Sequence, residues 1–280
     1  MAVLLEVGVL EYSCKSRFWI THAIYVVEVI VDIHLPRQKE IGKDINLQIS
    51  NASKTVRRVF SRGWWDGFGR FSGGFWQRVG DKEQRPFRRN IRINNEPIVE
   101  LDDSSLHPNI LTVEAGLESL EDVYTLGYQV NERFDQEQQR QIIKGLVLNL
   151  LNAKKLDAAL DAFTYKQPKG HLFKRLKKVQ YYAYVDAFKP KHPDLAGKIG
   201  NDEGIRLMYL DSQIMNNIIE KATTESVPIL TVHDPVICRE KDEPYVRTLM
   251  SSLERLSKAI HAHARQDSSD VLITASLFAC

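Results

Sequence analysis

Two aspartates directly follow short apolar segments of the chain. Asp102 ends the segment 97–102 (PIVELD), and Asp234 ends the segment 228–234 (PILTVHD). If these segments are neighbouring strands, both carboxylates meet at one sheet edge, where they can hold two Mg²⁺ or Mn²⁺ ions about 3.5–4 Å apart. Such ions activate an attacking hydroxyl and stabilise a leaving oxygen. The sequence predicts a two-metal site here, although an aspartate after a strand is also a common turn former.

A pair of basic residues between the two aspartates suits a triphosphate. Arg140 and Lys144 are four residues apart in 135–163, where apolar residues recur at helical spacing. They therefore share one helix face. A solvent-exposed pair without a ligand is the ordinary alternative.

The net charge of +2 conceals a basic block at residues 54–92, which carries eleven Lys or Arg against three acids. Tryptophans and phenylalanines are interleaved with these cations, a combination that suits phosphate contact and base stacking. We expect Arg70, Arg85, Arg88, Arg89 and Trp76 to contact nucleic acid. A second basic run, 166–178, has six Lys or Arg and no acid. For this run a solvated face and a nucleic-acid contact are both open.

The remaining elements are predicted from periodicity and turn signals. Short strands are expected in 1–34, loops with strand pieces in 61–80, and a strand in 227–232. Residues 91–102 predict a hairpin that turns at Asn94-Asn95. Helices are expected from Pro108 towards Gly116, over 135–163 with a break near Asn152, over 203–220 and over 243–264. Strands and helices without βαβ alternation indicate the α+β class.

Composition excludes several classes of protein. With 280 residues, 43% hydrophobic and 26% charged, the chain has the composition of a globular protein rather than of a disordered or collagen-like one. Its three cysteines are far apart, which fits a reducing compartment and gives no zinc signal. The most apolar stretch, 18–33, is interrupted by charged residues and is too short to span a bilayer. We therefore expect a cytoplasmic protein without a membrane segment.

The order of these residues resembles that of family A DNA polymerases and the related single-subunit phage-type RNA polymerases. Arg70 stands in G-R-F-S, Asp102 in V-E-L-D-D-S-S-L-H, Arg140 and Lys144 in R-x-x-x-K, and Asp234 in V-H-D. The family carries T-G-R-L-S, D-Y-S-x-x-E, R-x-x-x-K followed by Y-G, and H-D-E or H-D-S in the same order. The resemblance covers about residues 57–250.

The resemblance implies a polymerase palm with an antiparallel sheet, reduced helical fingers and a small or absent thumb. The palm would occupy 57–280, with fingers inserted at about 117–200, after a strand-rich segment 1–56 of unknown role. Asp102 and Asp234 would bind the metals, with Leu101 and Asp103 contributing there through their backbone.

Further roles follow from the same resemblance. Arg140 and Lys144 would hold the triphosphate, with Lys144 also catalytic, and Leu148 and Asn152 would line the nucleotide site. Arg70 would contact the minor groove of the primer–template, and His233 would position the primer end. His107 is the fifth residue after Asp102, where the family selects the sugar.

The chain departs from the family pattern at four positions. Asp103 replaces a tyrosine, Pro235 replaces the acid after the second aspartate, and Leu148 and Asn152 replace rings.

The expected function is template-directed nucleotidyl transfer by a minimal DNA polymerase that adds dNTPs to a primer 3′ end. DNA primer–template is the expected partner, RNA is an alternative, and a processivity partner would compensate for the reduced thumb. Three other functions stay open: a primase-like or template-independent transferase, a catalytically inactive palm that binds nucleic acid, and a metal nuclease.

Overall fold

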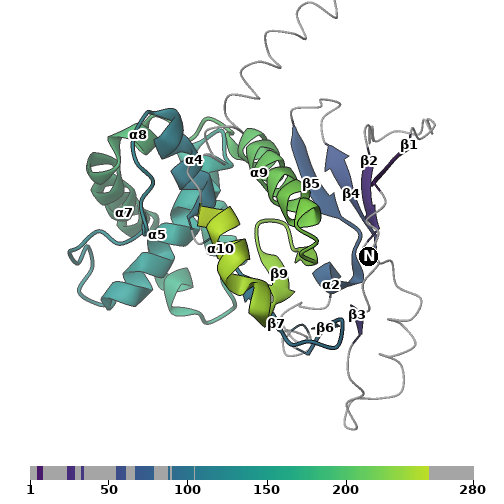
Figure 1. Cartoon of the computed structure of the whole chain (residues 1–280). Helices are drawn as coiled ribbons and strands as arrows, with labels where there is room; N and C mark the ends of the chain where they lie inside the picture. The colour runs from purple at the N-terminus through teal and green to yellow at the C-terminus, as the bar shows by residue number, and fades with distance from the viewer. Residues whose placement is uncertain are drawn as a thin grey trace, which may run out of the picture. The chain divides into compact units, whose positions relative to one another are not determined.

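The computed structural model describes residues 5–8, 24–28, 33–34, 55–60, 67–78, 88, 90–103 and 105–251 (Figure 1). Arg85 and Arg89 of the basic block lie outside these ranges. The helix predicted over 243–264 is described as far as Ser251. No helix within the described ranges is long and apolar enough to cross a membrane.

The chain divides into two compact units, and the class is α+β as predicted. The first unit contains residues 1–103 and 208–280, and the second contains residues 104–207. The predicted insertion at about 117–200 falls inside the second unit. The boundary expected after residue 56 falls inside strand β4, which belongs to the first unit.

The first unit contains a four-stranded antiparallel sheet in the order β1-β2-β4-β5. A register shift between Val59 and Phe60 marks an irregularity where β4 pairs with β5. A separate two-stranded pair joins β3 and β6. The strands are β1 (Leu5–Gly8), β2 (Ile24–Glu28), β4 (Thr55–Phe60), β5 (Phe68–Ser72), β3 (Ile33–His34) and β6 (Arg92–Ile93).

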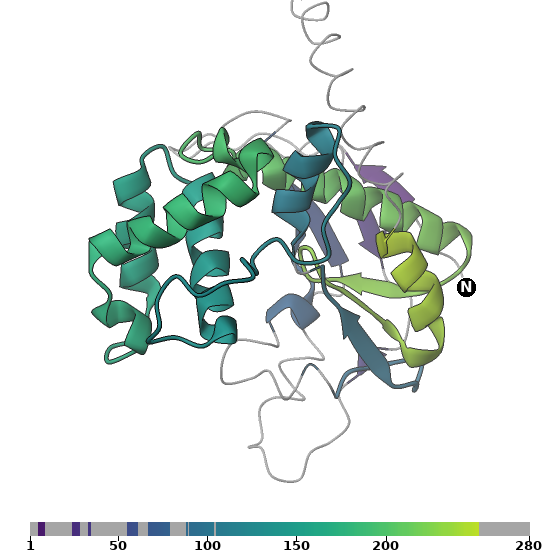
Figure 2. The same ribbon diagram turned by 90° about the vertical axis from the view of Figure 1, so that its left-hand side faces the viewer.

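A three-stranded antiparallel sheet in the first unit has the order β7-β9-β8 (Figure 2). Its strands are β7 (Ile98–Leu101), β8 (Ile229–Thr231) and β9 (Val236–Arg239). All of β8 is buried, as the apolar run 227–232 predicts, and most of β9 is buried as well.

The hairpin predicted over 91–102 is only partly present. Asn94 and Asn95 have φ of 52° and 62°, the left-handed pair that a tight two-residue turn requires. One bridge, between Ile93 and Glu96, closes this turn. The second predicted strand, β7, pairs with β9 instead. The prediction of a local hairpin was therefore wrong beyond its turn, because β7 finds its partner far along the chain.

The first unit also contains α2 (Phe75–Arg78), η2 (Glu240–Asp242) and α10 (Glu243–Ser251). Helix α9 (Gly204–Thr224) begins in the second unit and continues in the first. Figures 1 and 2 both show α9 running beside β4 and β5.

The second unit is helical. The stretch 135–163 forms two helices with a break after Leu151, as predicted. Asp135 and Gln138 form a capping box that fixes where the first of these helices begins. The described elements are α4 (Leu106–Glu114), α5 (Gln136–Leu151), α6 (Leu156–Lys166), η1 (Leu172–Arg175), α7 (Lys178–Lys191) and α8 (Pro193–Ala196).

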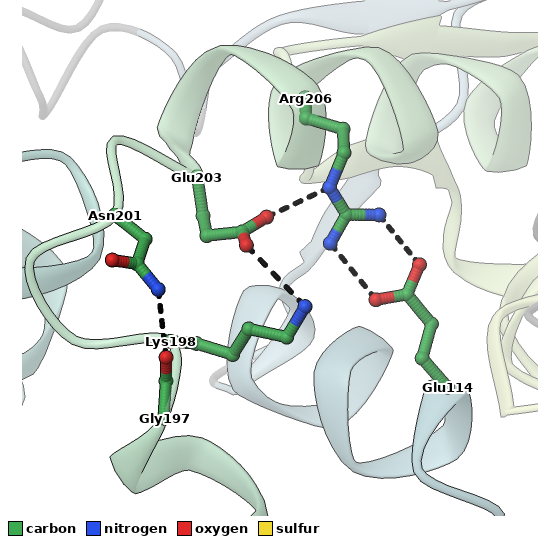
Figure 3. Close-up of polar contacts among 6 residues, drawn as sticks. All are labelled: Glu114, Gly197, Lys198, Asn201, Glu203 and Arg206. Atoms are coloured by element: carbon green, nitrogen blue, oxygen red, sulfur yellow. Dashed lines mark hydrogen bonds and ion pairs between the residues drawn. The ribbon is translucent and has the colours of Figure 1, made fainter.

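An ion-pair network links the first turn of α9 to the end of α4 within the second unit (Figure 3). The guanidinium of Arg206 donates to both carboxylate oxygens of Glu114, at 2.6 and 2.9 Å. It also donates to Glu203 at 2.7 Å, and Lys198 approaches Glu203 at 3.4 Å. These paired contacts fix both helix ends.

Candidate active site

The register of the three-stranded sheet brings the two predicted aspartates to the same sheet end. Leu101, the last residue of β7, is paired with Val236, the first residue of β9. Asp102 follows Leu101 directly, and Asp234 precedes Val236 by two residues. Because β7 and β9 are antiparallel neighbours, both aspartates leave the sheet at the same end.

Asp234 lies at the tip of the β8–β9 hairpin. The amide of Val232 donates to the carbonyl of Pro235 at 2.8 Å and closes the tip. His233 has a φ of 62°, a left-handed conformation that histidine tolerates better than most residues. The side chain of Asp234 is 37% exposed, so its carboxylate can reach a ligand. Asp102 is exposed and Asp103 is half-buried.

Arg70 lies between Asp234 and a buried aspartate of α9. Its guanidinium contacts Asp211 at 2.8 and 2.6 Å and approaches Asp234 at 3.9 Å. The Asp211 side chain is 2% exposed, and a carboxylate buried to this extent requires a counter-charge. Arg70 therefore compensates Asp211 and adds positive charge beside Asp234. Its predicted minor-groove contact stays a prediction.

A second buried arginine fixes α9 to the neighbouring strands. Arg58 of β4 donates to the Gly69 carbonyl at 2.9 Å and to the Ser212 hydroxyl at 2.7 Å. The Ser212 hydroxyl in turn donates to the Tyr209 carbonyl. Buried polar groups satisfied in this way specify one arrangement of the elements that carry them.

The environment of His233 favours the neutral imidazole. His233 is exposed to solvent, but partial desolvation of its ring by neighbouring atoms lowers its pKa, and the Arg70 guanidinium lowers it further. Asp234 and Asp211 act in the opposite direction, but the net pKa is below the ordinary value. At neutral pH the ring therefore offers one N–H donor and one nitrogen acceptor.

The donor set at the sheet end fits a hard divalent cation. In the described part of the chain, no group of three or more His, Cys, Asp or Glu side chains is placed to hold a metal ion. Mg²⁺, however, is commonly held by one or two carboxylates together with waters and substrate phosphates. Asp102 and Asp234 are two carboxylates at this end of the sheet.

The predicted nucleotide-binding helix is α5, in the second unit. Arg140 donates to the Asp122 carboxylate at 3.1 Å. Burial acts to raise the pKa of Asp122, but the hydrogen bonds from Arg140, Thr125 and the Tyr124 amide together lower it below its ordinary value. The Arg140 and Lys144 cations each lie 5.8 Å from the centre of the buried Tyr124 ring. Both basic side chains are therefore positioned over one aromatic ring.

The other predicted nucleotide-site residues also belong to the second unit. Leu148 is half-buried on α5, and the exposed Asn152 donates to the Leu148 carbonyl at 2.6 Å and ends the helix. His107 lies half-buried in the first turn of α4. The helix predicted near Pro108 begins at Leu106, so the proline falls in the first turn.

The structure places two of the predicted nucleic-acid contacts of the basic block, Trp76 and Arg88. Trp76 is fully buried, and its indole N–H donates to the Thr231 carbonyl at 2.9 Å. The expectation that its ring contacts nucleic acid was therefore wrong: the tryptophan is part of the core. Arg88 donates to Glu100 at 2.7 Å and is 16% exposed.

Sequence reasoning did not find that Asp211 and Arg58 support the site. Asp211 occurs on an amphipathic helix, where a buried and an exposed carboxylate look the same in sequence. The one signal was its place on the apolar face of α9, four residues after the buried Leu207 and three before the buried Ile214.

No protein-family model matches the chain, and no curated protein matches it.

Proposed function

We propose that the protein is a template-directed nucleotidyltransferase, a minimal DNA polymerase that adds dNTPs to a primer 3′ end. The observation that carries the proposal is the pairing of Leu101 with Val236, which directs Asp102 and Asp234 to one sheet end. Two carboxylates on neighbouring strand ends are the core of a two-metal phosphoryl-transfer site.

In this proposal Asp102 and Asp234 hold Mg²⁺ or Mn²⁺, with the Asp103 backbone beside them. When bound, the ions lower the pKa of the primer hydroxyl and neutralise charge on the phosphates. Arg70 restrains the Asp234 carboxylate through its own contact with Asp211. The neutral His233 ring donates a hydrogen bond to the primer end.

In this proposal helix α5 supplies the nucleotide contacts. Arg140 and Lys144 of α5 bind the triphosphate, and Leu148 and Asn152 line the base. In this proposal a palm occupies residues 57–280, with reduced fingers inserted at about 117–200. The partner is a DNA primer–template in the cytoplasm, with an accessory protein for processivity.

Primer extension with a labelled primer–template, dNTPs and Mg²⁺ tests the proposal. Asp102→Asn and Asp234→Asn should each reduce incorporation by at least about 10³-fold, because electrostatic stabilisation of the developing charge is lost. Asp186→Asn is the matched control, since Asp186 is exposed on α7 in the second unit. Binding of the primer–template should be retained in all three variants. Incorporation that survives either site substitution at near wild-type rate overturns the two-metal assignment.

The same assay separates the alternatives. Extension without template would identify a template-independent transferase, and shortening of the primer would identify a nuclease. A catalytically inactive palm that binds nucleic acid is favoured by one observation, the Arg70 guanidinium 3.9 Å from Asp234, which competes with a metal for that carboxylate. Tight binding with no incorporation under Mg²⁺ or Mn²⁺ would establish that function instead.

A further inference from the structure

The connection between α6 and α7 carries a concentrated positive charge. Between Asp161 and Asp186 the sequence has no acid, and six basic residues fall between 165 and 179. All six are exposed. They are Lys166, Lys169, Lys174, Arg175, Lys177 and Lys178. We call residues 165–179 the basic corner.

Most of this charge is not neutralised by neighbouring carboxylates. Lys178 pairs with Asp161 at 3.1 Å. Within the described ranges, Lys169, Arg175 and Lys177 form no ion pair. Elsewhere in the second unit, by contrast, Arg140 and Arg206 each pair with a carboxylate. Exposed cations held close together without counter-charges repel one another, and a polyanion relieves that repulsion.

Apolar side chains are exposed at the same corner. Among the described residues six large apolar side chains are exposed, and three of them are Tyr165 at 85%, Leu172 at 45% and Val179 at 68%. Tyr165 is the penultimate residue of α6, directly before Lys166, so a flat ring faces solvent in a segment rich in cations. This combination is what stacking on an unpaired base requires.

The backbone of the basic corner is fixed before any ligand binds. Phe173 is buried and packs edge-on against Phe134, with ring centres 5.7 Å apart. The Tyr181 hydroxyl donates to the Phe173 carbonyl, and Lys174 donates to the Gln167 carbonyl at 3.2 Å. A surface ordered in advance loses less entropy on binding.

We infer that the basic corner binds single-stranded nucleic acid, with its cations on successive phosphates and Tyr165 stacked on a base. A lipid surface fits less well, because peripheral membrane binding uses an amphipathic helix with a broad apolar face. Here the exposed cations instead follow a helix end, a turn, the short η1 and the start of α7. The inference rests on the proposed function in one respect only, namely which single-stranded nucleic acid the basic corner binds in the cell.

The test measures anisotropy of a fluorescein-labelled oligothymidylate over a range of salt concentrations with the full chain. The triple variant Lys169→Glu, Arg175→Glu and Lys177→Glu should raise Kd at least about tenfold at low salt. The salt slope should fall by about 0.7 for each lost phosphate contact, or about 2 in total. Tyr165→Ala should weaken binding about fivefold or more, with the salt slope unchanged.

A control with the same change in charge is Arg133→Glu, Lys155→Glu and Lys221→Glu, three exposed residues outside the basic corner. Thermal unfolding of each variant checks the fold. Equal Kd values and slopes in the two triple variants overturn the inference. The inference is also overturned if the corner variant loses binding to phosphatidylserine vesicles but keeps binding to the oligonucleotide.

The two proposals fail in distinguishable ways. Asp102→Asn should abolish incorporation and leave oligothymidylate binding at the basic corner unchanged. Loss of binding in the corner variant, in a protein that incorporates no nucleotide, would support the basic corner and reject the polymerase. If that variant instead incorporates nucleotides normally and binds oligothymidylate as tightly as the wild type, the polymerase is supported and the basic corner is rejected.

Discussion

Removal of the Arg70 guanidinium should take a close counter-charge away from a buried carboxylate. Arg70 contacts Asp211 through two nitrogens, at 2.8 and 2.6 Å, and the Asp211 side chain is 2% exposed. Loss of one partner of a buried ion pair costs about 3–5 kcal/mol. The Arg70 side chain is 15% exposed, so water can partly replace it. We therefore expect Arg70→Met to lower the free energy of unfolding by about 3 kcal/mol, a large part of the stability of a typical domain.

Urea unfolding at neutral pH measures this cost. Arg70→Met combined with Asp211→Asn should recover stability to within about 1 kcal/mol of the wild type, because no buried charge is left unpaired. This recovery would report charge compensation rather than lost packing.

Arg247→Met is the matched control. Arg247 is 61% exposed and pairs with Glu243 one helical turn away, so its loss should cost less than about 0.5 kcal/mol. If Arg70→Met costs no more than this control, Arg70 does not compensate Asp211. If the double variant is no more stable than Arg70→Met, packing rather than charge explains the loss.

Three further substitutions have expected outcomes. Gly145→Ala should lower the free energy of unfolding by about 1 kcal/mol or more, because a Cβ there would meet the Phe163 ring at 2.3 Å. This overpacking outweighs the gain of about 1 kcal/mol in helix propensity. In a urea double-mutant cycle, Phe163→Leu should remove the cost of Gly145→Ala. Burial lowers the pKa of His192, so the unfolded chain binds more protons than the folded chain below about pH 6.5, and the free energy of unfolding decreases as the pH drops. Urea denaturation across this pH range should show a smaller decrease for His192→Gln than for the wild type. The same pH dependence in both proteins would contradict this prediction. His107→Ala should raise ribonucleotide incorporation relative to deoxyribonucleotide if its bulk excludes the 2′-hydroxyl, which kcat/KM for GTP and dGTP in both proteins would decide.

Local signals predict the local structure well. The capping box at Asp135 and the apolar period of 135–163 fix the start and the face of α5, and both are properties of adjacent residues. The tight turn at Asn94-Asn95 is predicted for the same reason, since asparagine tolerates positive φ. The partner of β7 is not predictable in this way. Its pairing with β9 joins residues on either side of the whole second unit.

At the candidate site too, features of adjacent residues are predictable from the sequence and contacts between distant residues are not. Asp102 and Asp234 are visible in the sequence because each follows an apolar strand. The contact of Arg70 with Asp211 is invisible, because it joins residues 141 positions apart. Trp76 misleads for a related reason: an aromatic ring among arginines suits base stacking, but only tertiary structure shows whether the ring is exposed.

The position of the two carboxylates is set by apolar burial rather than by the carboxylates themselves. Two acids at one sheet end repel each other, so the site does not assemble for its own stability. Leu101 is 2% exposed and Val236 is fully buried, and a slip of one residue would turn such side chains to the opposite face. Loss of either side chain from the core costs about 2–3 kcal/mol, which holds the register that directs Asp102 and Asp234 to one end. The residues that place the chemistry are therefore the apolar neighbours of the acids, and an activity defect in a Leu101→Ala variant would arise from register and stability rather than from ligand contact.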